Sequence, residues 1–133
     1  MSDKCFLDTN VLLYLYDQDI DKKTIAKRLL SDGHYISTQV LNEFSNISLK
    51  KLKLSPREVQ RGLEVILNYT NLVIFSEKTI LEALDIKARY GFGYYDSLIL
   101  STAMENNCSI LFSEDLQHNQ RIGDQLVILN PFV

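Results

Sequence analysis

The chain has 133 residues, 46% hydrophobic and 23% charged, a composition that is typical of folded proteins and excludes a disordered chain. Its length suits a single domain over residues 1–133, in which roughly two thirds of the unfolded surface can be buried. A net charge of −3 excludes a protein that coats nucleic acid through a global basic field.

The cysteines and the start of the chain bear on its compartment. Cys5 and Cys108 lie in apolar, strand-like segments, so we interpret them as small buried side chains rather than as a disulfide or a metal site. The start MSDKC lacks the features of a signal peptide, and every apolar run is shorter than the about 20 residues that span a bilayer. We therefore expect a soluble, cytoplasmic protein that does not contact a membrane.

Short apolar strand candidates alternate with helical segments along the chain. The predicted strands are residues 4–7, 34–37, 72–75, 109–112 and 126–129. Helical spacing of apolar residues marks the segments around residues 11–16, 25–30, 40–48, 59–67, 80–88 and 99–104. Ser55, Pro56 and Glu58 supply the N-cap, first-turn proline and capping-box acid of one of these helices. The alternation predicts an α/β fold with a parallel sheet covered by helices on both faces.

Acidic residues follow the predicted strands, which is where open parallel sheets gather their functional groups. Asp8 comes directly after the first strand in FLDTN, residues 6–10. Because a lone buried carboxylate is costly, Asp8 must be hydrogen-bonded, paired or bound to a cation. The alternative interpretation of Asp8 is an N-cap of the helix that follows.

Two further acids lie on helical segments. Glu43, in QVLNEFSN, falls on the flank of the apolar stripe of its helix, from which it can also reach solvent. Asp96 has Ile99, Leu100 and Ala103 at positions i+3, i+4 and i+7, so it occupies the middle of an apolar stripe. The helix dipole also favours an acid in a first turn. Because such acids usually face solvent whereas this one faces the core, we favour a functional role for Asp96.

Glu114 and Asp115 follow the strand SILF, where turn chemistry is the alternative explanation. If all strands point one way, Asp8, Glu43, Asp96 and Asp115 converge at one edge of the sheet. Four converging carboxylates repel one another unless protons or a cation intervene. An inventory of carboxylates alone fits Mg²⁺ or Mn²⁺, which prefer oxygen ligands, and neither histidine has the spacing of a zinc ligand.

Four short motifs carry a resemblance to a known family. They are FLDTN (6–10), VLNEF (40–44), YDSLI (95–99) and FSEDLQ (112–117), which occur in this order and span nearly the whole chain. In these motifs the sequence resembles a PIN domain, and specifically the small VapC-type toxins of bacterial toxin–antitoxin pairs. The resemblance implies a three-layer α/β/α fold with a central parallel sheet, and a Mg²⁺- or Mn²⁺-dependent endoribonuclease that hydrolyses RNA phosphodiester bonds. It also implies an antitoxin protein partner and a homodimer.

The resemblance extends to individual residues. It assigns the catalytic, metal-binding pocket to Asp8, Glu43, Asp96 and Asp115. It assigns accessory positions to Thr9, Asn10, Ser113 and Glu114. Relatives often carry glycine in the loop after the last acid, whereas this chain reads QHNQ at residues 117–120. Because asparagine tolerates left-handed backbone geometry, Asn119 can take the place of that glycine.

The densest basic stretch is a candidate RNA-binding surface. It consists of Lys50, Lys51, Lys53, Arg57 and Arg61. Contact with phosphates would make binding weaken as salt rises. The alternative is a solvated helix end and loop, since basic clusters are often only surface.

Other functions stay open. A phosphoacceptor receiver domain has a similar fold but needs paired acids after the first strand, and Asp8 has no acidic neighbour. A non-catalytic PIN-like scaffold that only binds a partner would lack metal affinity, so metal binding distinguishes it. An RNA-processing nuclease without a toxin role would share the site and the chemistry.

Overall fold

The computed structural model describes residues 3–133, in which six strands form one sheet of order β3-β2-β1-β4-β6-β5. The strands are β1 Cys5–Leu7, β2 Tyr35–Ser37, β3 Asn71–Val73, β4 Ile110–Phe112, β5 Arg121–Ile122 and β6 Leu126–Leu129. The helices are α1 Thr9–Leu13, the 3₁₀ helix η1 Tyr14–Tyr16, α2 Ile20–Ser31, α3 Thr38–Lys50, α4 Pro56–Tyr69, α5 Glu77–Tyr90 and α6 Tyr94–Glu105.

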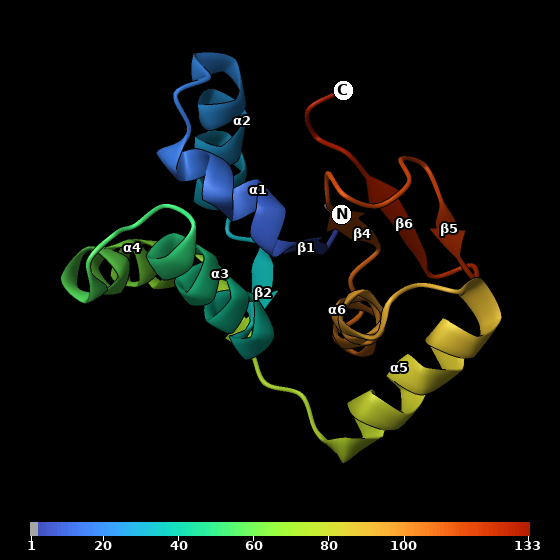
Figure 1. The fold of residues 1–133 in the computed structure, drawn as a ribbon. Helices are drawn as coiled ribbons and strands as arrows, with labels where there is room; N and C mark the ends of the chain where they lie inside the picture. Colours follow the sequence, from blue (N-terminus) through green and yellow to red (C-terminus); the bar gives the residue numbers. More distant parts are fainter. Residues whose placement is uncertain (1–2) are drawn as a thin grey trace.

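Helices cover both faces of a mostly parallel sheet, as the sequence predicts. Every pairing among β3, β2, β1, β4 and β6 is parallel, and β5 pairs antiparallel with β6 at one edge. Figure 1 shows α1 to α4 grouped together and α5 packed beside α6, with β1 and β2 between the two groups. This is a three-layer α/β/α architecture.

The five predicted strands are all present; β6 has the predicted bounds, and the ends of the other four differ from prediction by at most two residues. The structure adds β5, which the sequence analysis did not predict because two residues are too short to show an alternating pattern. The predicted start of α4 is confirmed. Ser55 Oγ accepts a hydrogen bond from the Glu58 amide at 3.1 Å, and Glu58 Oε1 accepts one from the Ser55 amide at 3.0 Å.

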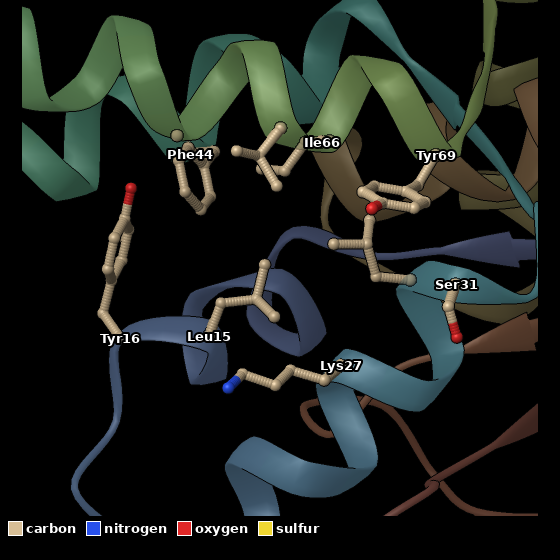
Figure 2. A pocket seen from close by; sticks show the side chains of 10 residues that line it. Leu15, Tyr16, Lys27, Ser31, Phe44, Ile66 and Tyr69 are labelled. Carbon is tan, nitrogen blue, oxygen red and sulfur yellow. The ribbon is translucent and has the colours of Figure 1, made fainter.

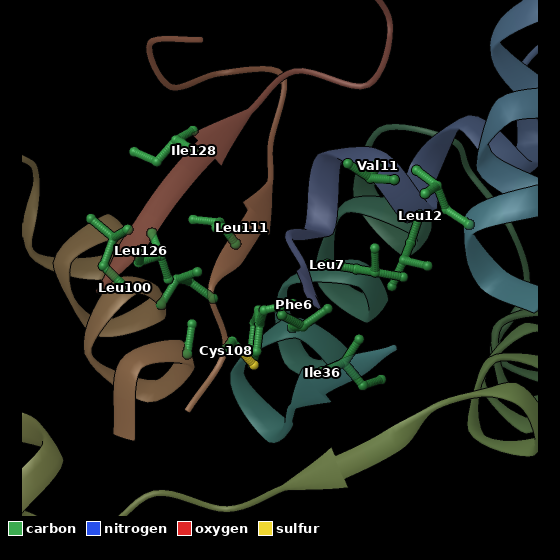
Figure 3. Packing of buried hydrophobic residues seen from close by; sticks show 14 of the residues in the cluster. Phe6, Leu7, Val11, Leu12, Ile36, Leu100, Cys108, Leu111, Leu126 and Ile128 are labelled. Atoms are coloured by element: carbon green, nitrogen blue, oxygen red, sulfur yellow. The ribbon is translucent and has the colours of Figure 1, made fainter. Parts of the chain in front are cut away.

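The hydrophobic core lies where the central strands meet the helices. Phe6 and Leu7 of β1, Ile36 of β2 and Leu111 of β4 are fully buried and pack together (Figure 3). Helix α6 is buried along Ser97–Ala103, because the sheet and α5 enclose it. Asp96 lies in the first turn of this helix, directly before its fully buried stretch, which is a more enclosed setting than one apolar stripe would give.

Two simpler expectations can be compared with the structure. Cys5 and Cys108 are buried and free, and burial raises the pKa of both thiols to about 11, as expected for unreactive core residues. Within residues 3–133, no helix combines the length and the apolar character needed to cross a bilayer.

Candidate acidic site

The acids lie at the carboxyl ends of the central strands. Strand β1 lies between β2 and β4, so the chain leaves β1 toward β2 on one side and returns later to β4 on the other. Such a reversal of strand order is the usual place of a binding site in parallel sheets. Asp8 follows β1, and its amide donates a hydrogen bond to the Phe112 carbonyl at the end of β4 (3.0 Å). Asp8 is thereby fixed beside the segment that carries Asp115.

Asp8 is a helix cap and a member of the acidic site at once. Its carboxylate accepts hydrogen bonds from the Thr9 amide at 2.7 Å and from Ser113 Oγ at 2.9 Å. The first bond caps α1, as the alternative interpretation of the sequence proposes. The second comes from beyond β4, so the cap also joins two segments that are far apart in the chain. Asp8 is only 6% exposed.

The Asn10 side chain connects the acids of the two strand ends. Its Nδ2 lies 3.4 Å from Asp8 Oδ2, 3.2 Å from Ser113 Oγ and 3.2 Å from Asp115 Oδ2. Its Oδ1 accepts a hydrogen bond from the Glu114 amide at 2.9 Å. One amide therefore holds Asp8 and Asp115 in a common arrangement.

Glu43 reaches the site from α3, which begins immediately after β2. Thr9 Oγ1 donates a hydrogen bond to Glu43 Oε1 at 3.0 Å, so the first residue of α1 ties this half-buried acid to the others. The flank position predicted for Glu43 directs it to the sheet edge.

Burial and the charges of neighbouring carboxylates raise the pKa values of three of the acids. Burial raises the pKa of Asp8 from 3.8 to about 7, mainly by desolvation, with smaller contributions from the charges of Glu43 and Asp96. Burial also raises the pKa of Glu43, and the Asp96 charge adds to that shift. Burial raises the pKa of Asp96 in turn, with help from the Asp115 charge. The structure therefore brings all four predicted acids into one group.

Asp96 is positioned through the residue before it. Gln39 of α3 is 8% exposed, and its Nε2 donates a hydrogen bond to the Tyr95 carbonyl at 3.0 Å. This bond fixes the start of α6, and with it Asp96, against the helix that carries Glu43. Gln39 is not among the site residues that the sequence predicts. Its position four residues before Glu43, on the same helix face, is the available signal.

Glu114 contacts Tyr14 and Lys22 instead of the other acids. Tyr14 Oη donates a hydrogen bond to Glu114 Oε1, and Lys22 Nζ lies 3.1 Å from Glu114 Oε2 in an ion pair. Lys22 also lies over the Tyr14 ring, 4.7 Å from its centroid. Neither Tyr14 nor Lys22 appears among the predicted site residues, because nothing in the local sequence marks a contact with residue 114.

The predicted basic surface lies at the end of α3 and the start of α4. Lys50 ends α3, Lys51 and Lys53 lie in the connection, and Arg57 and Arg61 belong to α4. All five side chains are exposed. Lys51 approaches the acidic site most directly, because it lines a pocket of about 270 Å³ together with Asn10 and Glu114.

The loop after the last acid adopts the backbone that the sequence predicts. Asn119 has φ 68°, in the left-handed region, and its amide donates a hydrogen bond to the Ile128 carbonyl at 2.7 Å. Asn119 therefore supplies the left-handed backbone that this turn needs.

The donors of the acidic site suit a hard divalent cation. They are carboxylate, amide and hydroxyl oxygens, which Mg²⁺ and Mn²⁺ prefer. Like charges with raised pKa values are also the condition that a cation relieves. Among residues 3–133, however, no three acidic, imidazole or thiol groups are already arranged as a ligand set.

Comparisons with known proteins agree with the fold. Residues 5–122 match the family described as the PIN domain. A toxin–antitoxin complex from Klebsiella pneumoniae is similar in structure, with TM-score 0.72 and 21% identity over 96% of this chain and 98% of the other.

Two further solved structures are similar. DNA-bound VapBC from Salmonella typhimurium gives TM-score 0.71 and 20% identity over 96% of this chain and 97% of the other. VapC20 from Mycobacterium tuberculosis, a sarcin–ricin loop cleaving toxin, gives 0.68 and 14% over 84% and 90%. No curated protein gives a significant sequence match. At these identities the structural likeness establishes the fold alone.

Proposed function

The chain belongs to the PIN-domain family, and on that premise we propose that it is a divalent-metal-dependent endoribonuclease and the toxin of a type II toxin–antitoxin pair. The observation that carries this proposal is the gathering of four carboxylates, from four separate segments, at the switch point of the sheet. The like charges of these carboxylates favour a cation-binding site over a stabilising role in folding, because burying Asp8 among them costs stability.

The four acids take different parts in the proposed chemistry. Asp8 and Asp96 are the principal ligands of a divalent ion, and Asp115 and Glu43 complete its surroundings directly or through water. A divalent ion held there supplies an activated water and neutralises charge on the phosphate. Burial raises the pKa of Glu43, which makes it a stronger base and suits it to help accept a proton.

Asn10, Thr9 and Ser113 orient these acids. Each forms a hydrogen bond with at least one carboxylate, and Asn10 bridges Asp8 and Asp115. Residues that hold ligands in this way set both their direction and their affinity for the ion. Glu114, paired with Lys22, contributes to the frame of the site rather than to the ion.

Basic side chains place the RNA. An acidic site repels a polyanion, so phosphates must be held by cations nearby. Lys51 shares a pocket with Asn10, and we propose that it contacts a phosphate next to the cleaved bond. The other basic residues of this surface extend the contact along the RNA backbone; they are Lys50, Lys53, Arg57 and Arg61.

A protein partner is part of the proposal. The two related assemblies from Klebsiella and Salmonella are complexes of toxin and antitoxin. This chain has a large apolar pocket of about 430 Å³ between η1, α2, α3 and α4 (Figure 2). We name it the apolar pocket; its lining includes Leu15, Tyr16, Phe44, Val65 and Tyr69. An apolar segment of an antitoxin would bury this surface. We also expect a homodimer, which light scattering tests.

Cleavage of total bacterial RNA tests the nuclease directly. We expect fragments with Mg²⁺ or Mn²⁺, and none with a chelator. Asp96→Asn should lose cleavage at least about 100-fold, because it removes a ligand charge. Asp85→Asn, which removes a charge from the exposed face of α5, is the matched control and should cleave normally. Full activity of a folded Asp96→Asn protein would contradict the assignment.

Expression in a bacterial host separates a toxin from a processing nuclease. Wild type and Asp85→Asn should arrest growth, whereas Asp96→Asn should not. Co-expression of the antitoxin should restore growth, and Val65→Asp in the apolar pocket should prevent that rescue. Leu67→Asp, on the same helix outside the pocket, is its control. A protein that cleaves RNA in vitro without slowing growth would point to RNA processing instead.

A further inference from the structure

A second pocket opens beside the acidic site and shares Glu43 with it. This pocket, which we call the amide pocket, has a volume of about 380 Å³ and is lined by Gln39, Asn42, Glu43, Asn46 and Tyr95. Its walls carry amides, a carboxylate and a phenol, and no lysine or arginine. A phosphate is therefore a poor ligand for it, because a carboxylate faces the space without a compensating cation.

Two amides of this pocket are available to a ligand. Asn42 and Asn46 are four residues apart on α3, so their side chains lie on one face of the helix, a turn apart. Both residues are exposed, and within residues 3–133 the structure gives neither side chain a hydrogen-bond partner. A carboxamide presents donors and an acceptor together, which matches the paired donor and acceptor on the edge of a nucleobase.

Tyr95 gives the pocket an aromatic wall. The residue is 66% exposed although it directly precedes Asp96. Its backbone is held by the hydrogen bond from Gln39, and its ring meets the Tyr94 ring edge-on at a centroid distance of 5.3 Å. The ring is thus supported at its base and along one side while most of its surface stays free. Exposed aromatic rings of this kind stack unpaired bases in RNA-binding proteins.

We infer that the amide pocket binds one unpaired base of the RNA, next to the phosphodiester that the acidic site cleaves. Tyr95 stacks on the base, and Asn42 and Asn46 hydrogen-bond to its edge. Since Glu43 belongs to both the amide pocket and the acidic site, the base is that of a nucleotide flanking the cleaved bond. Gln39 is a positioning residue, because it acts through Tyr95. The inference rests on the proposed ribonuclease function.

The test uses the cut site that the wild-type protein selects in total bacterial RNA. An oligonucleotide carrying that site is made with each of the four bases on either side of the cut. Rates are measured over a range of concentrations for wild type, Tyr95→Ala, Tyr95→Phe and the double variant Asn42→Ala/Asn46→Ala. Leu81→Ala removes an exposed apolar side chain from α5, away from the amide pocket, and serves as the control.

The pocket predicts a specific pattern of kinetic changes. Tyr95→Ala should raise KM about 5- to 150-fold, the range expected for one lost base stack, with kcat nearly unchanged. Tyr95→Phe should behave like wild type, because stacking needs the ring and not the hydroxyl. The double asparagine variant should lose the preference among the four bases at one flanking position. Leu81→Ala should change neither KM nor the base preference.

Two results would overturn the inference, and they differ in what else they affect. If wild type cleaves RNA but Tyr95→Ala and the double variant keep its KM and its base preference, the amide pocket does not bind a base and the nuclease proposal stands. If folded wild-type protein cleaves no RNA with either metal, the proposed function fails and the inference fails with it.

Discussion

Two consecutive residues of α3, Glu43 and Phe44, enter two very different parts of the molecule. Glu43 joins the acidic site, where four carboxylates interact through their charges. Phe44 is fully buried and forms a wall of the apolar pocket, beside Ile66 and Leu15 (Figure 2). Because side chains on a helix are 100° apart, one element supplies a polar surface and an apolar one without any change of backbone.

Electrostatic interactions dominate the acidic site, whereas burial of apolar surface dominates the apolar pocket. In the acidic site, desolvation of Asp8 and repulsion among the acids oppose folding, and hydrogen bonds from Thr9 and Ser113 offset part of that cost. In the apolar pocket, Val65 and Tyr69 stay about half exposed, so a partner can gain from covering them. Small changes should therefore have large effects in the first region and small ones in the second.

The largest contrast should come from Asp8→Asn. This change removes a ligand charge while it keeps the shape of the side chain, so we expect cleavage to fall at least about 100-fold. Initial rates with saturating Mg²⁺ measure this loss. Val65→Asp, which places a charge in the apolar pocket, should leave those rates unchanged. Equal losses in both variants would mean that the two regions are not independent.

Asp8 should also set how stability depends on pH in metal-free protein. Its pKa is raised from 3.8 to about 7 on folding, so between these values the folded state holds more protons than the unfolded state. The free energy of unfolding should therefore decrease as pH rises from about 4 to about 7, by roughly 4 kcal/mol at most. Urea denaturation with a chelator measures this decrease, and Asp8→Asn should lack most of it. The same slope in both proteins would contradict the raised pKa.

Ser113→Ala should have an intermediate effect. The Ser113 hydroxyl donates to Asp8 and lowers its pKa, so removing it should raise that pKa further above its present value of about 7. Less of Asp8 is then ionised at neutral pH, and we expect cleavage to fall about tenfold and to recover at higher pH. A pH–rate profile tests both statements. A fall in rate that is constant across pH would show that Ser113 acts without changing ionisation.

Lys51→Ala should weaken RNA binding modestly. If Lys51 contacts one phosphate of single-stranded RNA, its loss should reduce the slope of log affinity against log salt by about 0.7. Fluorescence anisotropy with labelled RNA and the inactive Asp96→Asn protein measures that slope. Lys78→Ala, on the exposed start of α5, is the control and should keep it. An unchanged slope for Lys51→Ala would leave the basic stretch as solvated surface.

The smallest effect should come from Gly62→Ala in the apolar pocket. A Cβ at this position would overlap the Tyr16 hydroxyl, the far end of a side chain that is 37% exposed and can move aside. Alanine also favours the helix by about 1 kcal/mol over glycine, so the free energy of unfolding should change by less than about 1 kcal/mol. Urea denaturation measures this. A tenfold fall in cleavage would reveal a link between the pocket and the acidic site.

The sequence predicts the acidic site better than the apolar pocket because the acids contradict their surroundings. Asp8 and Asp96 interrupt apolar patterns, so each is visible alone, and the strand order of a parallel sheet then brings them together. Residues such as Phe44 and Ile66 fit the ordinary pattern of a core, and only their arrangement in space shows that they line a pocket.

The polar contacts around the acidic site also leave no pattern in the sequence. Lys22 reaches Glu114 and Gln39 reaches Tyr95 across 92 and 56 residues of sequence, and neither pair has a local signature. Strand β5 was missed for a related reason, since two residues pair only because β6 offers an edge. Patterns along the chain predict helices, strands and acids that interrupt apolar segments. Hydrogen-bond and ion-pair partners, by contrast, depend on which distant segments pack together.

Titration of Mn²⁺ by calorimetry tests the central claim, that the four acids form a site for a divalent cation. Wild type, Asp96→Asn and the control Asp85→Asn are compared after circular dichroism has shown each to be folded. We predict clear binding by wild type and Asp85→Asn, and affinity at least tenfold weaker in Asp96→Asn. Equal binding by Asp96→Asn, or no binding by folded wild type, would contradict the claim.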